Sequence, residues 1–209
     1  MENQTRYQEI IIFGAGGVGS WIAEYLTRMK LTRRIIIVDY DKVEAKNMNR
    51  QNYTMLDKNM EKTIALQTRL NMIQSRTNNE EEREVIIRTH NKKIEDEIDI
   101  ITYDKTSLAI LATDNVKSKQ TIAKHFKHFL LINCDEDYVE IKNYMDKEET
   151  SAWDMGGGYN SNQNIISNIN SAVMAVTILD QYERAIRSTK FSYIFKPVTN
   201  TGKLLQGSV

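Results

Sequence analysis

Four glycines near the amino terminus have the spacing of a phosphate-binding turn. An apolar run at residues 10–13 precedes them, helical spacing of apolar residues follows, and the glycines are Gly14, Gly16, Gly17 and Gly19. Glycines allow the backbone to approach phosphate oxygens closely, and the N–H groups and dipole of a helix start favour negative charge. We therefore expect this turn to hold phosphate groups.

A second polar cluster follows the next apolar run, residues 35–38. Its members are Asp39, Asp41, Asn47, Arg50 and Gln51. A carboxylate at the end of this strand can accept hydrogen bonds from ribose hydroxyls, which is the role we expect for Asp39. A dehydrogenase needs that carboxylate but not Arg50, whose guanidinium could pair with the oxygens of a triphosphate.

The elements that must position these residues alternate along the chain, which predicts an α/β fold with a doubly wound, mostly parallel sheet. Strands are expected at about 8–13, 34–39, 85–88, 108–112 and 129–133, and helices at about 18–30, 60–76, 115–128 and 165–186. Residues 40–59 and 153–164 read as loops, and residues 92–103 are ambiguous between a short helix and a crossover. An outer strand at 138–145 and a final strand at 191–196, before the only proline, predict a short antiparallel extension at the carboxyl end.

Composition sets outer bounds on function. The 209 residues suit a single domain, residues 1–209, and Lys plus Arg and Asp plus Glu both number 28. The zero net charge argues against bulk binding to nucleic acid or to an anionic membrane. No apolar run approaches the roughly 18 residues of a membrane span, and the amino terminus is too polar for a secretory signal. A single cysteine excludes an internal disulfide framework, so a reducing, cytoplasmic location is expected.

The chain resembles the ThiF/MoeB/HesA superfamily, the nucleotide-binding module shared with ubiquitin-activating enzymes. Four elements carry the resemblance: GAGGVGS, VDYDKVEAKNMNRQ, a lysine about a dozen residues on, and ATDN at the end of a later strand. The second element is the specific one, because ordinary dehydrogenases share only the first. The resemblance covers roughly residues 8–134, with a weaker echo at 165–186.

The resemblance implies a Rossmann-like ATP-binding half whose enzymes use ATP and Mg²⁺ to convert a carboxylate into an acyl-adenylate. The glycine turn would hold the nucleotide, Asp39 would take the ribose, and the triphosphate would face Asn47, Arg50 and Gln51, with Asp41 beside them. This set forms the expected nucleotide-binding site.

The same resemblance implies that Arg50, Lys62 and Asp114 are catalytic. Lys62 would neutralise charge that develops on the α-phosphate, and Asp114 would bind Mg²⁺. Lys62 falls one residue short of the usual spacing after the arginine, so Lys58 competes for its role. Asp114 could instead cap a helix, and Arg50 could pair only with Asp41 or Glu44.

Two further features have structural interpretations. Cys134 invites a thioester role, but a single cysteine after an apolar strand is more often a small buried residue. The helix expected at about 115–128 should carry a basic, solvated face, and a docking site for an acidic partner is the alternative. The residues of this face are Lys117, Lys119, Lys124, His125, Lys127 and His128.

Departures from the family also bear on function. There is no pair of Cys-x-x-Cys motifs, so no structural zinc is expected. Relatives usually carry an amino-terminal helix whose arginine reaches the partner subunit's ATP, and the closeness of Arg6 to the first strand argues against it as a substitute.

Three hypotheses follow. The first is an adenylyltransferase acting on the carboxy-terminal glycine of a ubiquitin-like or sulfur-carrier protein, with a peptide terminus or a modified tRNA base carboxylate left open. The others are an NAD-dependent dehydrogenase and a non-catalytic nucleotide-binding partner subunit.

The apolar surface of the helix at 165–186 exceeds one helical stripe, which predicts a homodimer; burial on two sides within the monomer is the competing explanation. Glycines at 156–158 are expected at the edge of a groove for an extended substrate tail.

Overall fold

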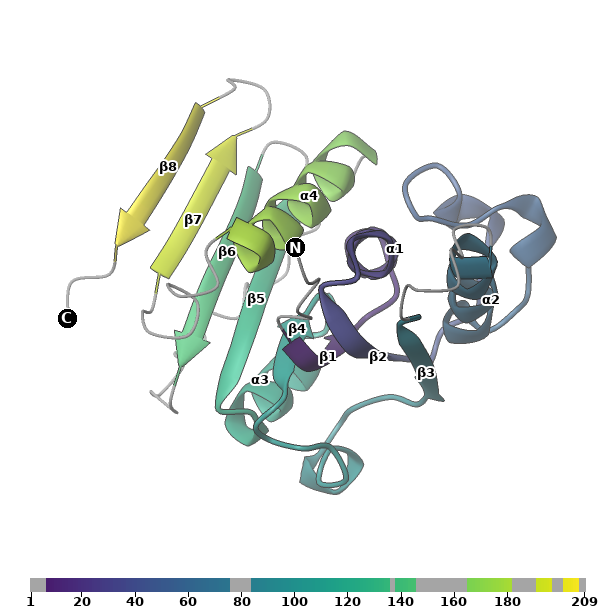
Figure 1. Cartoon of the computed structure of the whole chain (residues 1–209), viewed down its shortest axis with the longest axis horizontal. Helices are drawn as coiled ribbons and strands as arrows, with labels where there is room; N and C mark the ends of the chain where they lie inside the picture. The colour runs from purple at the N-terminus through teal and green to yellow at the C-terminus, as the bar shows by residue number, and fades with distance from the viewer. Residues whose placement is uncertain are drawn as a thin grey trace.

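The structure, a computed structural model, describes residues 7–75, 84–135, 138–145, 165–181, 191–196 and 201–206. The described strands form one eight-stranded sheet in the order β3-β2-β1-β4-β5-β6-β7-β8 (Figure 1). The strands are β1 Tyr7–Phe13, β2 Thr32–Asp39, β3 Ile86–Asn91, β4 Leu108–Leu111, β5 His128–Asp135, β6 Tyr138–Met145, β7 Phe191–Lys196 and β8 Thr201–Gln206. The helices are α1 Gly19–Met29, α2 Lys62–Ser75, α3 Val116–His125 and α4 Ile165–Gln181, with short 3₁₀ turns η1 Ala45–Asn47, η2 Met55–Asp57 and η3 Glu97–Asp99.

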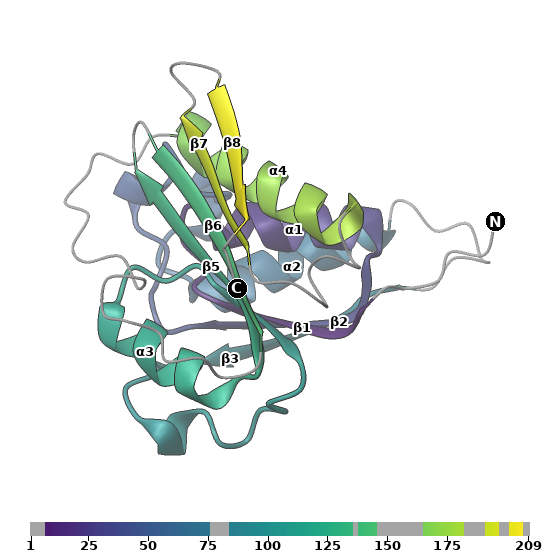
Figure 2. The same ribbon diagram turned by 90° about the vertical axis from the view of Figure 1, so that its left-hand side faces the viewer.

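Strands β3, β2, β1, β4 and β5 are parallel, and β6, β7 and β8 extend the sheet in antiparallel fashion. Helices α1, α2 and α4 cover one face of the sheet, and α3 covers the other (Figure 2). The order of the strands reverses between β1 and β4, which is where ligands bind in doubly wound sheets. The expected doubly wound fold with an antiparallel carboxy-terminal extension is therefore confirmed.

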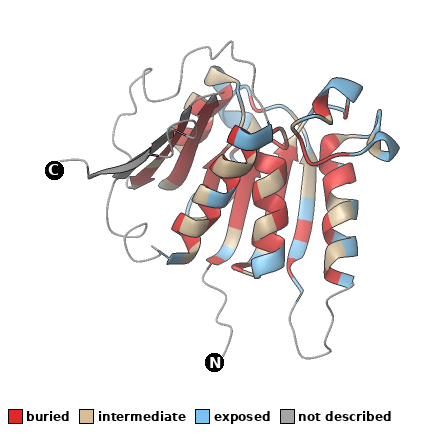
Figure 3. Cartoon of the chain, turned by 90° about the horizontal axis from the view of Figure 1, so that it is seen from above, coloured by how far each residue is buried: buried red, intermediate tan, exposed pale blue. Residues whose placement is uncertain are grey.

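The central strands are apolar along their length because helices cover both of their faces. Ile10 and Ile12 of β1 point into the core shared with α1, α2 and α4, whereas Ile11 and Phe13 point into the core shared with α3. Figure 3 shows α4, α1 and α2 side by side along one face, with α1 in the middle. None of the described helices is both long and apolar enough to cross a membrane.

Several expected boundaries and orientations were wrong. Residues 191–196 do not form the last strand, because β8 pairs with β7 after the proline. The third helix ends at His125, so His128 begins β5 rather than lying on a helix. The apolar spacing of the expected helix at 60–76 predicts Ile64 on its inward face, but Ile64 is 40% exposed, whereas Lys62 is buried together with Leu66 and Leu70. The reason is the orientation of α2 about its axis, which turns inward the face formed by Lys62 and every fourth residue after it.

Other expectations meet the limits of the described residues. Residues 92–103 contain only the turn η3 and otherwise irregular backbone. The expected loop at 153–164 with its glycines, and the expected helical residues 182–186, lie outside the described residues.

Candidate active site

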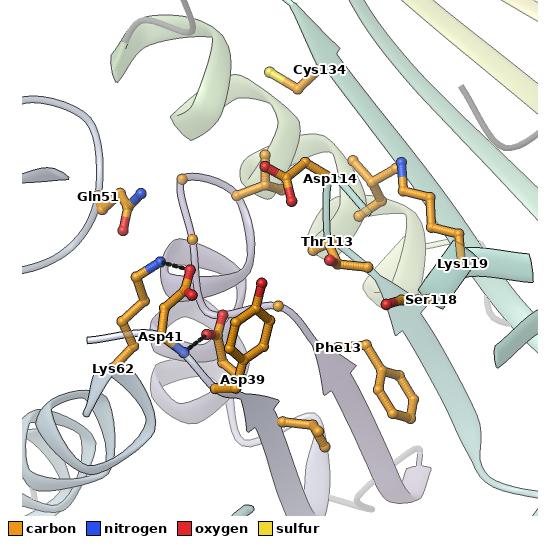
Figure 4. A pocket seen from close by; sticks show the side chains of 18 of the residues that line it. Phe13, Asp39, Asp41, Gln51, Lys62, Thr113, Asp114, Ser118, Lys119 and Cys134 are labelled. Carbon is orange, nitrogen blue, oxygen red and sulfur yellow. Dashed lines mark hydrogen bonds and ion pairs between the residues drawn. The ribbon is translucent and has the colours of Figure 1, made fainter. Parts of the chain in front are cut away.

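A cavity of about 730 Å³ lies over the carboxyl ends of β1, β2, β4 and β5, at the point where the strand order reverses (Figure 4). Its lining is mostly polar and charged. It brings together these residues predicted from the sequence: Gly14, Gly16, Gly17, Asp39, Asp41, Arg50, Gln51, Lys62 and Asp114. Two predicted residues, Gly19 and Asn47, do not line it.

The glycine turn brings backbone very close to backbone. Gly14 has a φ of 102°, and a β carbon there would lie 2.8 Å from the carbonyl of Ala112 at the end of β4. A β carbon on Gly19 would lie 1.8 Å from Gly14 O, so Gly19 allows α1 to start against the turn instead of contacting a ligand. Val18, the N-cap residue of α1, provides no side-chain cap, and Ser20 N donates to Gly16 O at 3.2 Å. The other N–H groups of the first turn, which no side chain caps, point toward the position that an anion can take.

Asp39 connects the glycine turn to the chain after β2. Its Oδ2 accepts a hydrogen bond of 2.6 Å from the backbone N–H of Ala15, and its Oδ1 accepts one of 2.8 Å from that of Asp41. Burial raises the pKa of Asp39 above its usual value, and the positive charge of Lys62 opposes this effect. Each carboxylate oxygen has further lone pairs, so the carboxylate can accept hydrogen bonds from hydroxyl groups in the cavity.

Lys62 is a buried cation held by a more exposed carboxylate. Its Nζ lies 2.8 Å from Asp41 Oδ2, with the lysine side chain 7% exposed and that of Asp41 47% exposed (Figure 4). The single hydroxyl proton of Tyr53 is shared between Ala15 O at 2.7 Å and Lys62 O at 3.3 Å, which ties the start of α2 to the glycine turn. The competing Lys58 is exposed and does not line the cavity.

Arg50 and Gln51 follow η1 in the chain, and both line the cavity. Arg50 donates from Nη1 to Lys46 O at 2.8 Å and to Asn49 Oδ1 at 3.0 Å, and it forms no ion pair with Asp41 or Glu44. Gln51 Oε1 is buried without a hydrogen-bond partner among the described residues. A buried amide in a cavity wall with unused hydrogen-bonding capacity is a group that a ligand can satisfy.

Asn47 supports this segment from behind. Its Oδ1 accepts a hydrogen bond of 2.9 Å from Glu44 N, and its carbonyl accepts from the backbone N–H groups of Arg50 and Gln51 at 3.1 and 2.8 Å. The residue is 5% exposed. Asn47 therefore positions Arg50 and Gln51, and its predicted direct contact with a triphosphate stays a prediction.

Asp114 lies in the cavity wall between β4 and α3. It does not cap α3, because Asn115 does so by accepting a hydrogen bond of 2.9 Å from Ser118 N. The described residues contain no group of three His, Cys, Asp or Glu side chains that could hold a metal. Magnesium commonly uses one or two protein carboxylates together with phosphate oxygens and waters, so one exposed carboxylate fits Mg²⁺ accompanied by a nucleotide.

Lys119 belongs to the cavity, and its expected place on a solvated basic face was wrong. It is 4% exposed, and its Nζ donates to Asn133 Oδ1 at 2.8 Å. Burial lowers the pKa of Lys119 to about 8, while the charges of Asp114 and Glu140 oppose this shift. The signal in the sequence was its spacing from Ile122, Ala123 and Phe126, which form the buried stripe of this segment.

Cys134 on β5 contacts helix α4 through its side chain. It is 7% exposed, lines the cavity, and donates from Sγ to Asn168 Oδ1 at 3.4 Å. This burial agrees with the interpretation of Cys134 as a small packed residue, whereas its contact with α4 was not visible in the sequence.

The glycine turn, the carboxylate at the end of β2 and the cavity at the reversal of strand order define a Rossmann-like α/β domain. The chain belongs to the ThiF family, whose family model matches residues 2–130.

The chain is similar to curated relatives in sequence and to solved structures in fold. Ubiquitin-like modifier-activating enzyme 5 of Drosophila melanogaster is 39% identical over 91 residues, which cover 44% of this chain and 20% of the relative. The protein of the same name from Caenorhabditis briggsae is 50% identical over 50 residues, which cover 24% of this chain and 11% of the relative. The structure of E. coli MccB with ATP matches 97% of this chain and 64% of its own, with a TM-score of 0.76 and 13% identity. PaaA matches the same shares, with a TM-score of 0.71 and 19% identity. The chain thus spans less than two thirds of the length of each of these relatives.

Proposed function

We propose that this chain is an ATP-dependent adenylyltransferase. An oxygen of the substrate carboxylate attacks the α-phosphorus of ATP, the bond from that phosphorus to the β-phosphate oxygen breaks, and pyrophosphate leaves with the bonding electrons. The product is an acyl-adenylate. The observation that carries the proposal is the buried cation Lys62, held by Asp41 at the edge of a glycine-lined cavity that also contains Asp114.

The geometry supports a binding mode in which different walls of the cavity hold different parts of the nucleotide. Asp39 takes the ribose hydroxyls, and the glycine turn with the uncapped start of α1 takes phosphate oxygens. Arg50, Gln51 and Lys62 lie on the β2 side of this turn and stabilise the charge that passes to the pyrophosphate. Asp114 would hold Mg²⁺, which supplies further charge neutralisation when bound.

The substrate class follows from the relatives. Two of them are named as activating enzymes for a ubiquitin-like modifier, and one structure of E. coli MccB is described with MccA. We propose the carboxyl terminus of a small ubiquitin-like or sulfur-carrier protein as the substrate, with a short peptide terminus as the second form. The exposed Ile165, Ile166 and Val173 on α4 support a homodimer. A cytoplasmic location remains the expectation from composition.

The test is the exchange of labelled pyrophosphate into ATP in the presence of Mg²⁺ and peptides that end in a Gly-Gly carboxylate. Lys62→Met should lower exchange by about 100-fold or more, since it removes a preorganised charge that acts on the transition state. Lys58→Met is the matched control, because Lys58 is exposed and outside the cavity. Binding of ATP by the wild type without exchange for any carboxylate would support a non-catalytic partner subunit instead.

A further inference from the structure

A second buried lysine, Lys119, lines the same cavity at a distance from Lys62 in the fold. Lys62 contacts Asp41, just after β2, whereas Lys119 contacts Asn133 near the end of β5. Strands β1 and β4 separate β2 from β5 in the sheet, and Asp114 follows β4. Figure 4 accordingly shows Asp114 between the two lysine side chains. The cavity therefore has one buried cation on each side of Asp114.

A hydrogen-bonded row of side chains holds Lys119 in place. Asn133 accepts from Lys119 Nζ at 2.8 Å and donates from Nδ2 to Glu140 Oε2 at 3.0 Å. Glu140 also forms an ion pair of 3.0 Å with Lys142 on β6. Since Lys142 balances the charge of Glu140, the group that directly contacts Lys119 is the neutral amide of Asn133.

Lys119 retains capacity for an anion. An ammonium group has three N–H donors, and within the described residues Lys119 uses one, for Asn133. It forms no ion pair among those residues, whereas Lys62 has Asp41. The charged groups that act on it are Asp114 after β4 and Glu140 on β6, and Glu140 is itself paired with Lys142. Lys92 and Cys134 are further titratable groups that line the cavity. A buried cation without a charged partner is costly unless it binds something.

We infer that Lys119 binds the terminal carboxylate of the acceptor substrate. This inference rests on the proposed function. In phosphoryl-type transfer the attacking and leaving oxygens lie roughly in line across phosphorus. With pyrophosphate leaving toward Lys62 and Arg50 on the β2 side, the carboxylate enters from the β5 side, where Lys119 lies. One carboxylate oxygen accepts a hydrogen bond from Lys119 Nζ while the other attacks.

This role differs from that of Lys62 in the kinetic constant it affects. The contact with Lys119 forms when the acceptor binds and persists into the transition state, so it lowers the KM for the acceptor more than it raises kcat. A lysine that only pins α3 to β5 would affect stability without changing the KM for either substrate. A lysine that contacts the nucleotide would change the KM for ATP.

The experiment measures pyrophosphate exchange as a function of ATP and of a peptide ending in a Gly-Gly carboxylate, with the peptide's carboxy-terminal amide as the blank. Lys119→Met should raise the KM for the peptide by about 10- to 100-fold, because a charged hydrogen bond is lost. The KM for ATP should stay within about twofold. Lys119→Arg should retain most of the affinity, and Lys117→Met, on the exposed side of α3, should behave as wild type.

A pH series provides a second readout. In the wild type the KM for the peptide should rise above about pH 8, where Lys119 loses its proton. This rise should be absent in Lys119→Arg, because a guanidinium does not titrate there. An unchanged peptide KM in Lys119→Met, or an increase only in the KM for ATP, would overturn the inference while leaving the proposed function intact. If the wild type binds ATP but catalyses no pyrophosphate exchange with any carboxylate, both the inference and the proposed function are overturned.

Discussion

Gly17 of the glycine turn lies directly against Asn168 of α4, so that a β carbon on Gly17 would be 2.2 Å from Asn168 Nδ2. Asn168 also donates a hydrogen bond of 3.3 Å to Arg50 O and accepts one from the thiol of Cys134. A residue of α4 that is distant in sequence therefore holds together the glycine turn, the Arg50 segment and β5.

Gly17→Ala should destabilise the protein by about 1–3 kcal/mol, the usual cost of overpacking, because Asn168 must give up its hydrogen bonds to make room. Gly16→Ala is the matched control, since the nearest atom to its β carbon would be Gln51 Nε2 at 3.9 Å. Urea denaturation measures both variants. Adding Asn168→Ala to Gly17→Ala should recover part of the loss, and strictly additive effects would show that the two residues are not coupled.

ATP with Mg²⁺ should stabilise the protein against thermal unfolding, and NAD should not. In the proposed function Lys62 and Arg50, which line the cavity, pair with the triphosphate, which carries more negative charge than the two phosphates of a dinucleotide. The expected stabilisation is about 2.7 kcal/mol at a hundredfold excess over the dissociation constant. Stabilisation by NAD alone would favour the dehydrogenase hypothesis.

Asp39→Ala and Arg50→Ala should have different kinetic signatures. Asp39→Ala should mainly raise the KM for ATP, because a ribose contact is nearly equal in ground and transition states. Arg50→Ala should mainly lower kcat, since its phosphate partner gains charge during the step. Pyrophosphate exchange at varied ATP concentration separates the two effects, and identical signatures would contradict this division of roles.

Asp39 should also make stability depend on pH. Its pKa is raised in the folded state by burial, so the folded protein holds this proton more tightly than the unfolded chain. The contribution of Asp39 to stability is complete below the unfolded pKa near 4 and is lost as pH rises through the higher folded pKa. The free energy of unfolding of wild type minus that of Asp39→Asn should therefore fall as pH rises across this window. A difference that rises instead would mean that the folded pKa is depressed.

The exposed apolar residues of α4 should mediate a homodimer. Ile166 is 64% exposed and Val173, seven residues later on the same face, is 44% exposed. Light scattering at micromolar concentration should give twice the monomer mass for the wild type, and Ile166→Asp with Val173→Asp should give the monomer mass. Ile98→Asp, at an exposed position on η3, is the control. A wild-type monomer that catalyses exchange would show that the dimer is not required.

The sequence by itself determined the order of strands and helices from β1 to β7, the glycine turn and the place of Asp39. These features depend on residues close together in the chain: apolar periodicity decides the element, and glycines decide where backbone can approach backbone. The parallel register of β1 with β2 follows from the same local pattern, because a short strand–helix–strand connection brings the two strands together.

The tertiary structure decided which face of each helix turned inward and which residues then met. The rotation of α2 buried Lys62 and exposed Ile64, and the packing of α3 against β5 placed Lys119 on Asn133. Asn168 could not be assigned from the sequence, because its partners Gly17 and Arg50 are more than a hundred residues away. Contacts of this kind arise only when α4 packs beside α1, and the energy of burying that shared apolar surface determines them rather than any local preference of the chain.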